Sequence, residues 1–150
     1  MGLDMYLTAE RYLWTAEKPI SDQVANLLGL QLDGDRMRVQ SVTAEAMYWR
    51  KANAIHNWFV ENVQDGEDEC RRHYVDRDQL IALRDLCKTL CKEKIEALAE
   101  ESLPTTEGFF FGSTDYDEWY WNDIENTITG IDRALETFGE EWSFYYQSSW

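Results

Sequence analysis

The sequence predicts an α+β fold, in which two long helices and a shorter helix pack on one face of a small antiparallel sheet. Segments with the alternating pattern of strands lie near both ends of the chain, and longer stretches with helical periodicity lie between them. A length of 150 residues and a hydrophobic share of 44% predict one domain, residues 1–150, with a substantial core.

The first strand is expected at the N-terminus, where apolar side chains alternate with polar or smaller ones at Leu3, Met5 and Leu7. A short helix is expected next, over residues 23–28, and Gly29 is expected to end it. Together these two elements predict that the chain begins in the sheet and then leaves it.

The next elements are a turn, a strand region and a helix. Asp33-Gly34-Asp35 has the composition of a turn, and residues 36–49 are expected to form one long strand or a pair of strands. Residues 51–63 are expected to be helical because their apolar side chains recur at helical spacing. These side chains are Ile55, Trp58, Phe59 and Val63.

A short strand at residues 74–75 is expected to precede the first long helix. Asp76 is the predicted N-cap of this helix, and Gln79 stands at the position that completes a capping box. The helix is expected to continue to about Ser102, because Pro104 disfavours helical backbone before it.

The C-terminal third is predicted to contain the second long helix and the last strand. Residues 107–112 hold three phenylalanines between two glycines, which indicates a short buried strand or a tight loop. The helix is expected to run from Asp115 to Phe138 with Gly139 as its C-cap, and residues 142–146 are expected to form the final strand.

The formal net charge of −15 is concentrated in this same third. Eleven acidic residues and one basic residue, Arg133, lie between Glu101 and Trp150. Such a surface repels phosphate and attracts cationic partners where the acids face solvent. The N-terminus lacks a secretory signal, no long apolar run is present, and the three cysteines fit reduced thiols, so a cytoplasmic protein without membrane contact is expected.

Basic and amide side chains converge at only one place in the sequence, the block from Arg50 to Asn57. Asn53, His56 and Asn57 share one face of the predicted helix, and Arg50 and Lys51 stand at its N-terminus. Cations beside free backbone N–H groups suit a phosphate, and the amides suit the edge of a nucleobase. A solvated helix face, with both cations neutralising nearby acids, is the alternative interpretation.

Exposed aromatic side chains are a second candidate feature. Tyr116, Trp119 and Tyr120 cannot all be buried if Trp121 and Ile124 mark the core face of the second long helix. Some of them are expected at a ligand lid, where they would stack on a base, or at an oligomer interface. Burial in the core is the usual role of aromatic residues at helical spacing.

The sequence holds no cofactor signature and no clear catalytic motif. Cys70, His73, Cys87 and Cys91 have the chemistry of metal ligands, but their spacing matches no standard zinc module. A nucleophile pair of Cys70 with His56 requires that the fold bring them together. An enzyme is therefore the weaker expectation, and a binding protein is the stronger one.

Three blocks of the chain resemble a family of small uncharacterised proteins encoded by bacteriophages and prophages. They are GLDMYL at residues 2–7, YWRKANAIHNWFV at residues 48–60, and LPTT followed by GFFFGS and YDE at residues 103–118. The resemblance covers most of the chain but implies no catalytic residue. It implies an accessory phage protein that acts in the host cytoplasm, a class that often counters host defences.

Two functions follow as competing hypotheses. The first is a protein that sequesters a small anionic ligand, such as a nucleotide defence signal, through the eight candidate residues named above. The second is an acidic blocker of a basic host protein, in which helix acids imitate the charge row of nucleic acid. This row would consist of Asp117, Glu118, Asp123, Glu125, Asp132 and Glu136. Neither hypothesis involves direct binding to nucleic acid.

Overall fold

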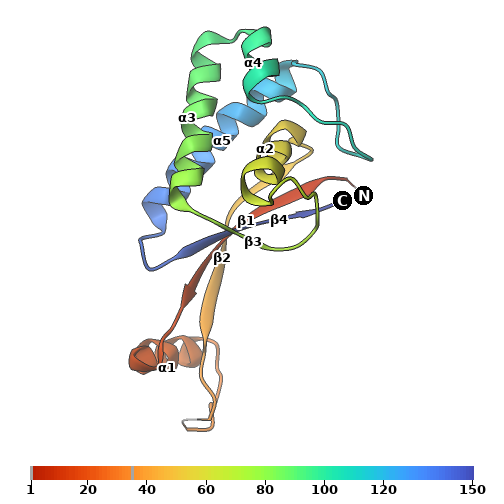
Figure 1. Cartoon of the computed structure of the whole chain (residues 1–150). Helices are drawn as coiled ribbons and strands as arrows, with labels where there is room; N and C mark the ends of the chain where they lie inside the picture. The colour runs from red at the N-terminus through yellow and green to blue at the C-terminus, as the bar shows by residue number, and fades with distance from the viewer. Residues whose placement is uncertain (1, 35) are drawn as a thin grey trace.

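A computed structural model describes residues 2–34 and 36–150, and it contains a four-stranded antiparallel sheet with strand order β2-β1-β4-β3. The α+β class predicted from the sequence is confirmed. The first and last strands are neighbours, so the two ends of the chain lie side by side (Figure 1). The strands are β1 (Asp4–Tyr12), β2 (Ser41–Arg50), β3 (His73–Val75) and β4 (Ser143–Ser149).

The helices α2, α3 and α5 cover one face of the sheet (Figure 1), as the sequence predicts. Met5, Leu7 and Ala9 of β1 are fully buried beneath these helices. Tyr6 and Thr8, which alternate with them, are only half-buried on the opposite face. The helices are α1 (Lys18–Leu27), α2 (Asn53–Val63), α3 (Arg77–Glu93), α4 (Glu96–Ser102) and α5 (Glu118–Thr137), with a 3-10 turn, η1, at Thr15–Glu17. No helix in the described part of the chain is long and apolar enough to cross a membrane.

The first long helix, α3, begins as predicted but ends earlier. Asp76 and Gln79 form the expected capping box. The prediction of one helix to Ser102 is wrong, because Lys94 adopts left-handed backbone at φ 49° and donates its N–H to the Leu90 carbonyl at 2.8 Å. The chain then turns into the separate helix α4. No glycine marks this break, so the sequence gives little warning of it.

The second long helix, α5, differs from its prediction at both ends. It begins after Asp117 rather than at Asp115, because the Asp117 carboxylate accepts hydrogen bonds from the Trp119 and Tyr120 N–H groups. Gly139 is not a left-handed C-cap, since the helix leaves through extended backbone at Phe138.

The α5 helix packs closely against the sheet at a glycine. A Cβ on Gly130 would lie 2.2 Å from the Met47 sulfur, so a larger residue would fit here only if the flexible Met47 side chain moved. Nearby, the buried Trp49 indole N–H donates to Thr127 Oγ1 at 2.9 Å, which joins β2 to α5 inside the core.

Residues 11–40, which we call the arm, extend away from the helices that cover the sheet (Figure 1). The helix α1 is longer than predicted, whereas β2 begins at Ser41 and not at Arg36. Within the arm, the segment just before β2 is joined to α1, because the Val39 N–H donates to Ser21 Oγ at 2.9 Å. Of the predicted turn at residues 33–35, Gly34 has φ 52°, and Asp35 lies outside the described residues.

Candidate functional site

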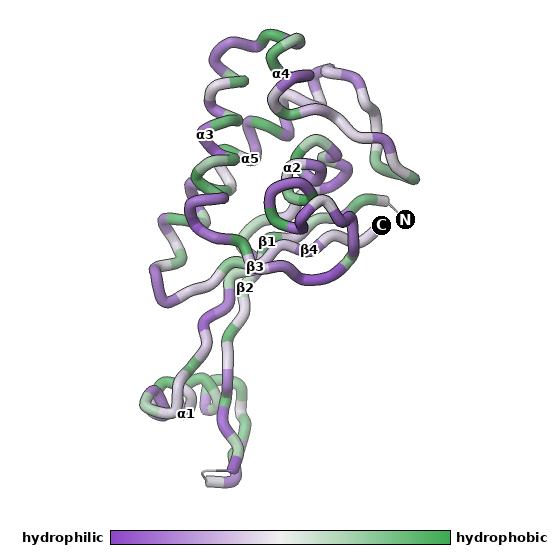
Figure 2. Tube along the Cα trace, in the orientation of Figure 1, coloured by the Kyte–Doolittle hydropathy of each residue, from purple (hydrophilic) through white to green (hydrophobic). Residues whose placement is uncertain are grey.

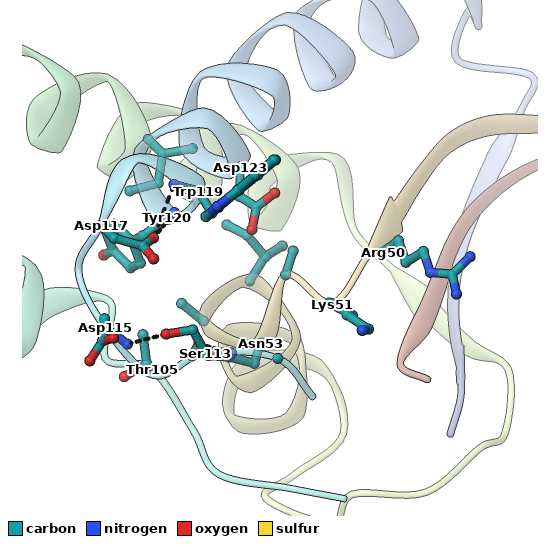
Figure 3. Close-up of a pocket in the computed structure, with 15 residues that line it drawn as sticks. Arg50, Lys51, Asn53, Thr105, Ser113, Asp115, Asp117, Trp119, Tyr120 and Asp123 are labelled. Carbon is teal, nitrogen blue, oxygen red and sulfur yellow. Dashed lines mark hydrogen bonds between the residues drawn. The ribbon is translucent and has the colours of Figure 1, made fainter. Parts of the chain in front are cut away.

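A cavity of about 490 Å³ lies where the N-terminus of α2 faces the first turns of α5 and the loop between α4 and α5 (Figure 3). Its volume is in the range of small-molecule sites. Of the eight candidate residues, five line it: Arg50, Lys51, Asn53, Trp119 and Tyr120. The structure therefore brings together residues that lie about 70 positions apart in the sequence.

The N-terminus of α2 is open toward the cavity. Its N-cap is Ala52, which has no side-chain oxygen, and no side chain caps the helix. Among the described residues, no acceptor binds the N–H groups of Ala54 and Ile55, both of which line the cavity. Free N–H groups at the positive end of a helix dipole form a binding site for an anion.

Of the two predicted cations, Lys51 is the one directly before the first turn of α2, although its side chain, like that of Arg50, points away from the other labelled side chains (Figure 3). The aliphatic part of Lys51 runs past Gly2 and Gly112, and its backbone has the left-handed φ of 58° that turns the chain from β2 into α2. The Arg50 side chain points away from the other labelled side chains (Figure 3). Arg50 therefore contributes little charge to the interior of the cavity.

Asn53 is a structural residue of the cavity wall. It is 4% exposed, and its amide nitrogen donates to the carbonyls of Phe111 at 3.2 Å and Ser113 at 2.8 Å. Its oxygen accepts from the Thr106 N–H at 3.1 Å. The amide predicted to contact a ligand instead fastens the loop of residues 105–113 to α2.

His56 and Asn57 do not line the cavity. His56 is fully buried, with Nδ1 2.7 Å from the Tyr146 hydroxyl and Nε2 3.1 Å from an Asp68 carboxylate oxygen. Nε2 makes no hydrogen bond among the described residues, so its contact with Asp68 is a close approach of the two groups. Burial raises the pKa of Tyr146 well above its usual value. This cluster joins α2 to β4 and to the loop before β3.

The three aromatic candidates have three different environments. Trp119 is 76% exposed and lines the cavity, so its ring is available for stacking. Tyr120 is buried, and its hydroxyl donates to the Leu103 carbonyl at 2.9 Å. Tyr116 is half-buried and does not line the cavity, and its hydroxyl accepts from the Thr105 N–H at 3.2 Å. Only Trp119 offers a free aromatic face to a ligand here.

Three aspartates complete the cavity, and none was among the predicted site residues. Asp115 is exposed, Asp117 caps α5, and Asp123 is half-buried. Burial and the neighbouring Asp117 raise the pKa of Asp123 to about 6. The spacing of four residues from Trp119 to Asp123 places both on one helix face, and this was the sequence signal for Asp123.

The described contacts of His56 do not pair it with a cysteine. Cys87 is fully buried, and burial raises the pKa of its thiol to about 12. Both ring nitrogens of His56 face Tyr146 and Asp68 rather than Cys70. Within residues 2–34 and 36–150, no group of three or more potential ligands is arranged to hold a metal ion.

The predicted row of acids on α5 is largely engaged in other contacts. Asp117 caps the helix and Asp123 lines the cavity, as described above. Glu125 pairs with Lys94 at 3.4 Å, and Asp132 pairs with Arg84 and with Lys88. Only Glu118 and Glu136 remain exposed without a described partner, so the free carboxylates are not evenly spaced along the helix.

Comparison with protein-family models, curated proteins and solved structures finds no match for the chain. The chemistry of the cavity is therefore the basis for assigning a function. The two ends of the cavity differ in the groups that line them. One end has helix N–H groups and a lysine, and the other has carboxylates beside an exposed tryptophan.

Proposed function

We propose that this chain is a binding protein that holds a small ligand with one anionic group and one flat ring, such as a nucleotide, in the cavity beside α2. The observation that carries the proposal is the uncapped N-terminus of α2. Among the described residues, no acceptor binds the N–H groups of Ala54 and Ile55, and Lys51 lies at the same end of the helix. A phosphate or carboxylate group supplies the acceptors that these donors lack.

The opposite end of the cavity suits the remainder of a nucleotide. Trp119 presents a ring on which a base can stack, an interaction of roughly 1–3 kcal/mol. The carboxylates of Asp115 and Asp123 accept hydrogen bonds, so they favour ring amino groups and ribose hydroxyls. Free phosphate alone would use only the α2 end of the cavity.

The formal charge of −15 opposes anion binding less than its size suggests. At physiological ionic strength the screening length is about 8 Å, so distant exposed carboxylates are largely screened. The charges that line the cavity then dominate the interaction. Two cations and three aspartates line it, so the arrangement of these charges, and not their sum, favours a ligand oriented with its anion at Lys51 and its hydrogen-bond donors at the aspartates.

The resemblance to phage and prophage proteins suggests a biological role for such binding. A phage accessory protein that sequesters a nucleotide would lower the concentration of a host defence signal in the cytoplasm. This role needs tight binding without turnover.

Calorimetric titration of the full chain with the four common ribonucleoside monophosphates tests the proposal. Inorganic phosphate and the matching nucleosides serve as probes of the two ends. Lys51→Ala and Trp119→Ala are each expected to weaken binding about tenfold or more, since tenfold corresponds to about 1.4 kcal/mol. Arg50→Ala is the matched control and should leave affinity unchanged. Failure of all four nucleotides to bind, or equal losses in the Arg50 and Lys51 variants, would contradict the proposal.

An acidic blocker of a basic host protein is the second candidate, and the exposed carboxylates of Glu118, Glu136, Glu140 and Glu141 favour it. Such binding would weaken steeply as salt is added, because it depends on exposed charge. Substituting Glu136 and Glu140 by Gln would reduce it, whereas Lys51→Ala would not. Nucleotide binding should show the opposite dependence on these variants.

A further inference from the structure

The arm exposes a concentration of large apolar side chains far from the cavity. Figure 2 shows hydrophobic segments in and beside α1. These side chains and their exposed fractions are Trp14 at 68%, Leu27 at 88%, Leu28 at 67%, Leu30 at 47% and Met37 at 56%. Single exposed apolar residues are common, but a cluster of this kind marks a contact surface.

The helix α1 has an apolar stripe that the described residues leave half-buried or exposed. Ile20, Val24, Leu27 and Leu28 follow the i, i+4, i+7, i+8 spacing of one helix face. The side chains that α1 does bury are only Ser21 and Ala25. The helix therefore packs on the arm through small residues, while its large apolar residues remain half-buried or exposed.

The arm is electrically neutral in an acidic protein. Residues 11–40 contain four basic and four acidic residues, so the remainder of the chain carries the whole formal charge of −15. Two of these pairs are closed within the arm, Arg11 with Glu17 at 2.8 Å and Lys18 with Asp22 at 2.9 Å. A charged partner would find little complementary charge there, whereas a neutral apolar surface would fit.

We infer that the arm is a dimerisation element, whose apolar α1 stripe packs against the same stripe of a second copy around a twofold axis. A second copy supplies the neutral, apolar surface that the arm requires, and a twofold contact is complementary to itself. Because the arm extends away from the sheet and its helices, two acidic bodies remain apart in such a dimer (Figure 1). Contact through the bodies would instead bring like charges together.

The exposed area is sufficient for a stable pair. A large side chain has roughly 150–250 Å² of surface, so the exposed parts of the five side chains named above amount to about 600 Å² per copy. A symmetric contact that covered Trp14, Leu30 and Met37 as well as the α1 stripe would bury about 1,200 Å² in total, which is at the lower end of specific interfaces. This area allows a specific dimer, and its affinity depends on how well the two surfaces fit.

Sedimentation equilibrium of the full chain over a range of micromolar concentrations tests this inference. The wild type is expected to dimerise, and added salt should leave the dimer intact because the contact is apolar and the arm is neutral. Leu27→Glu and Leu27→Lys should each weaken dimerisation about tenfold or more, and both should fold because Leu27 is almost fully exposed. Ile95→Glu, at a 51% exposed apolar residue outside the arm, is the matched control and should leave the dimer intact.

Three outcomes would overturn the inference. The first is a wild type that stays monomeric at the highest concentrations, which would assign the arm to another apolar partner. The second is a dimer that persists in both Leu27 variants. The third is a dimer that dissociates equally in the Ile95 variant. Circular dichroism of each variant confirms that a loss of dimer is not a loss of fold.

Discussion

Asn53→Ala is the substitution that tests how the cavity is built. The Asn53 side chain makes three hydrogen bonds to the loop of residues 105–113, two as donor and one as acceptor. Each such bond contributes about 0.5–1.5 kcal/mol net, and water reaches two of the freed partners because those bonds are only partly buried. We therefore expect the free energy of unfolding to fall by about 2–3 kcal/mol.

The loss should be local as well as global. Without the Asn53 oxygen, the Thr106 N–H has no described acceptor, so its hydrogen exchange should accelerate more than that of amides in β1. Urea unfolding measures the global effect, and exchange followed by NMR measures the local one. Nucleotide binding should weaken because the loop forms one wall of the cavity.

Asn57→Ala is the matched control for this prediction. It makes the same change in the same helix, at a residue for which no side-chain hydrogen bond is described, so it isolates the small gain in helix propensity from Ala. A loss of less than about 0.5 kcal/mol in Asn53→Ala relative to Asn57→Ala, or unchanged exchange at Thr106, would refute the view that Asn53 fastens the loop.

Three further predictions concern the residues around the cavity and the core. Lys51→Gly should be more stable in urea than Lys51→Ala by about 1 kcal/mol, because of these two residues Gly alone adopts φ 58° without strain. Equal stability of the two variants would contradict this prediction. The pKa of Asp123 is raised to about 6, so the wild type should lose stability relative to Asp123→Asn as pH rises from about 4 through 6. A difference in unfolding free energy between the two that does not vary between pH 4 and 7 would contradict this prediction. Thr127→Val leaves the buried Trp49 N–H unpaired and should cost about 1–3 kcal/mol, and thermal unfolding that matches the wild type would show that this bond contributes little.

The sequence predicted the elements whose signals are local. Asp76 and Gln79 are three residues apart and form their capping box through short-range geometry, so the start of α3 was readable. The break at Lys94 was not, because a lysine in left-handed backbone has no distinctive sequence signal. The strand predicted over residues 36–49 begins later for a related reason. The Val39 N–H bonds to Ser21, 18 residues away, and not to a neighbouring strand.

The candidate site was predicted in composition but not in the role of each residue. The sequence placed Lys51 at a helix N-terminus and predicted that some of Tyr116, Trp119 and Tyr120 are exposed; Lys51 and the exposed Trp119 line the cavity. It could not show that Asn53 binds the loop of residues 105–113 or that His56 faces Tyr146, since these contacts join segments 50 to 90 residues apart. Asp123 was overlooked because acids are too frequent in this chain for one to be distinctive.

The central claim is that an anion binds at the N-terminus of α2 while a ring stacks on Trp119. The most direct measurement is an NMR titration of the ¹⁵N-labelled chain with whichever ribonucleoside monophosphate binds most tightly. The account predicts that the amides of Ala54 and Ile55 and the indole N–H of Trp119 shift together along one binding curve, and that amides of the arm do not move. Inorganic phosphate should shift only the two amides. Shifts confined to other surfaces, or no shift at Ala54 and Ile55 at saturation, would contradict the account.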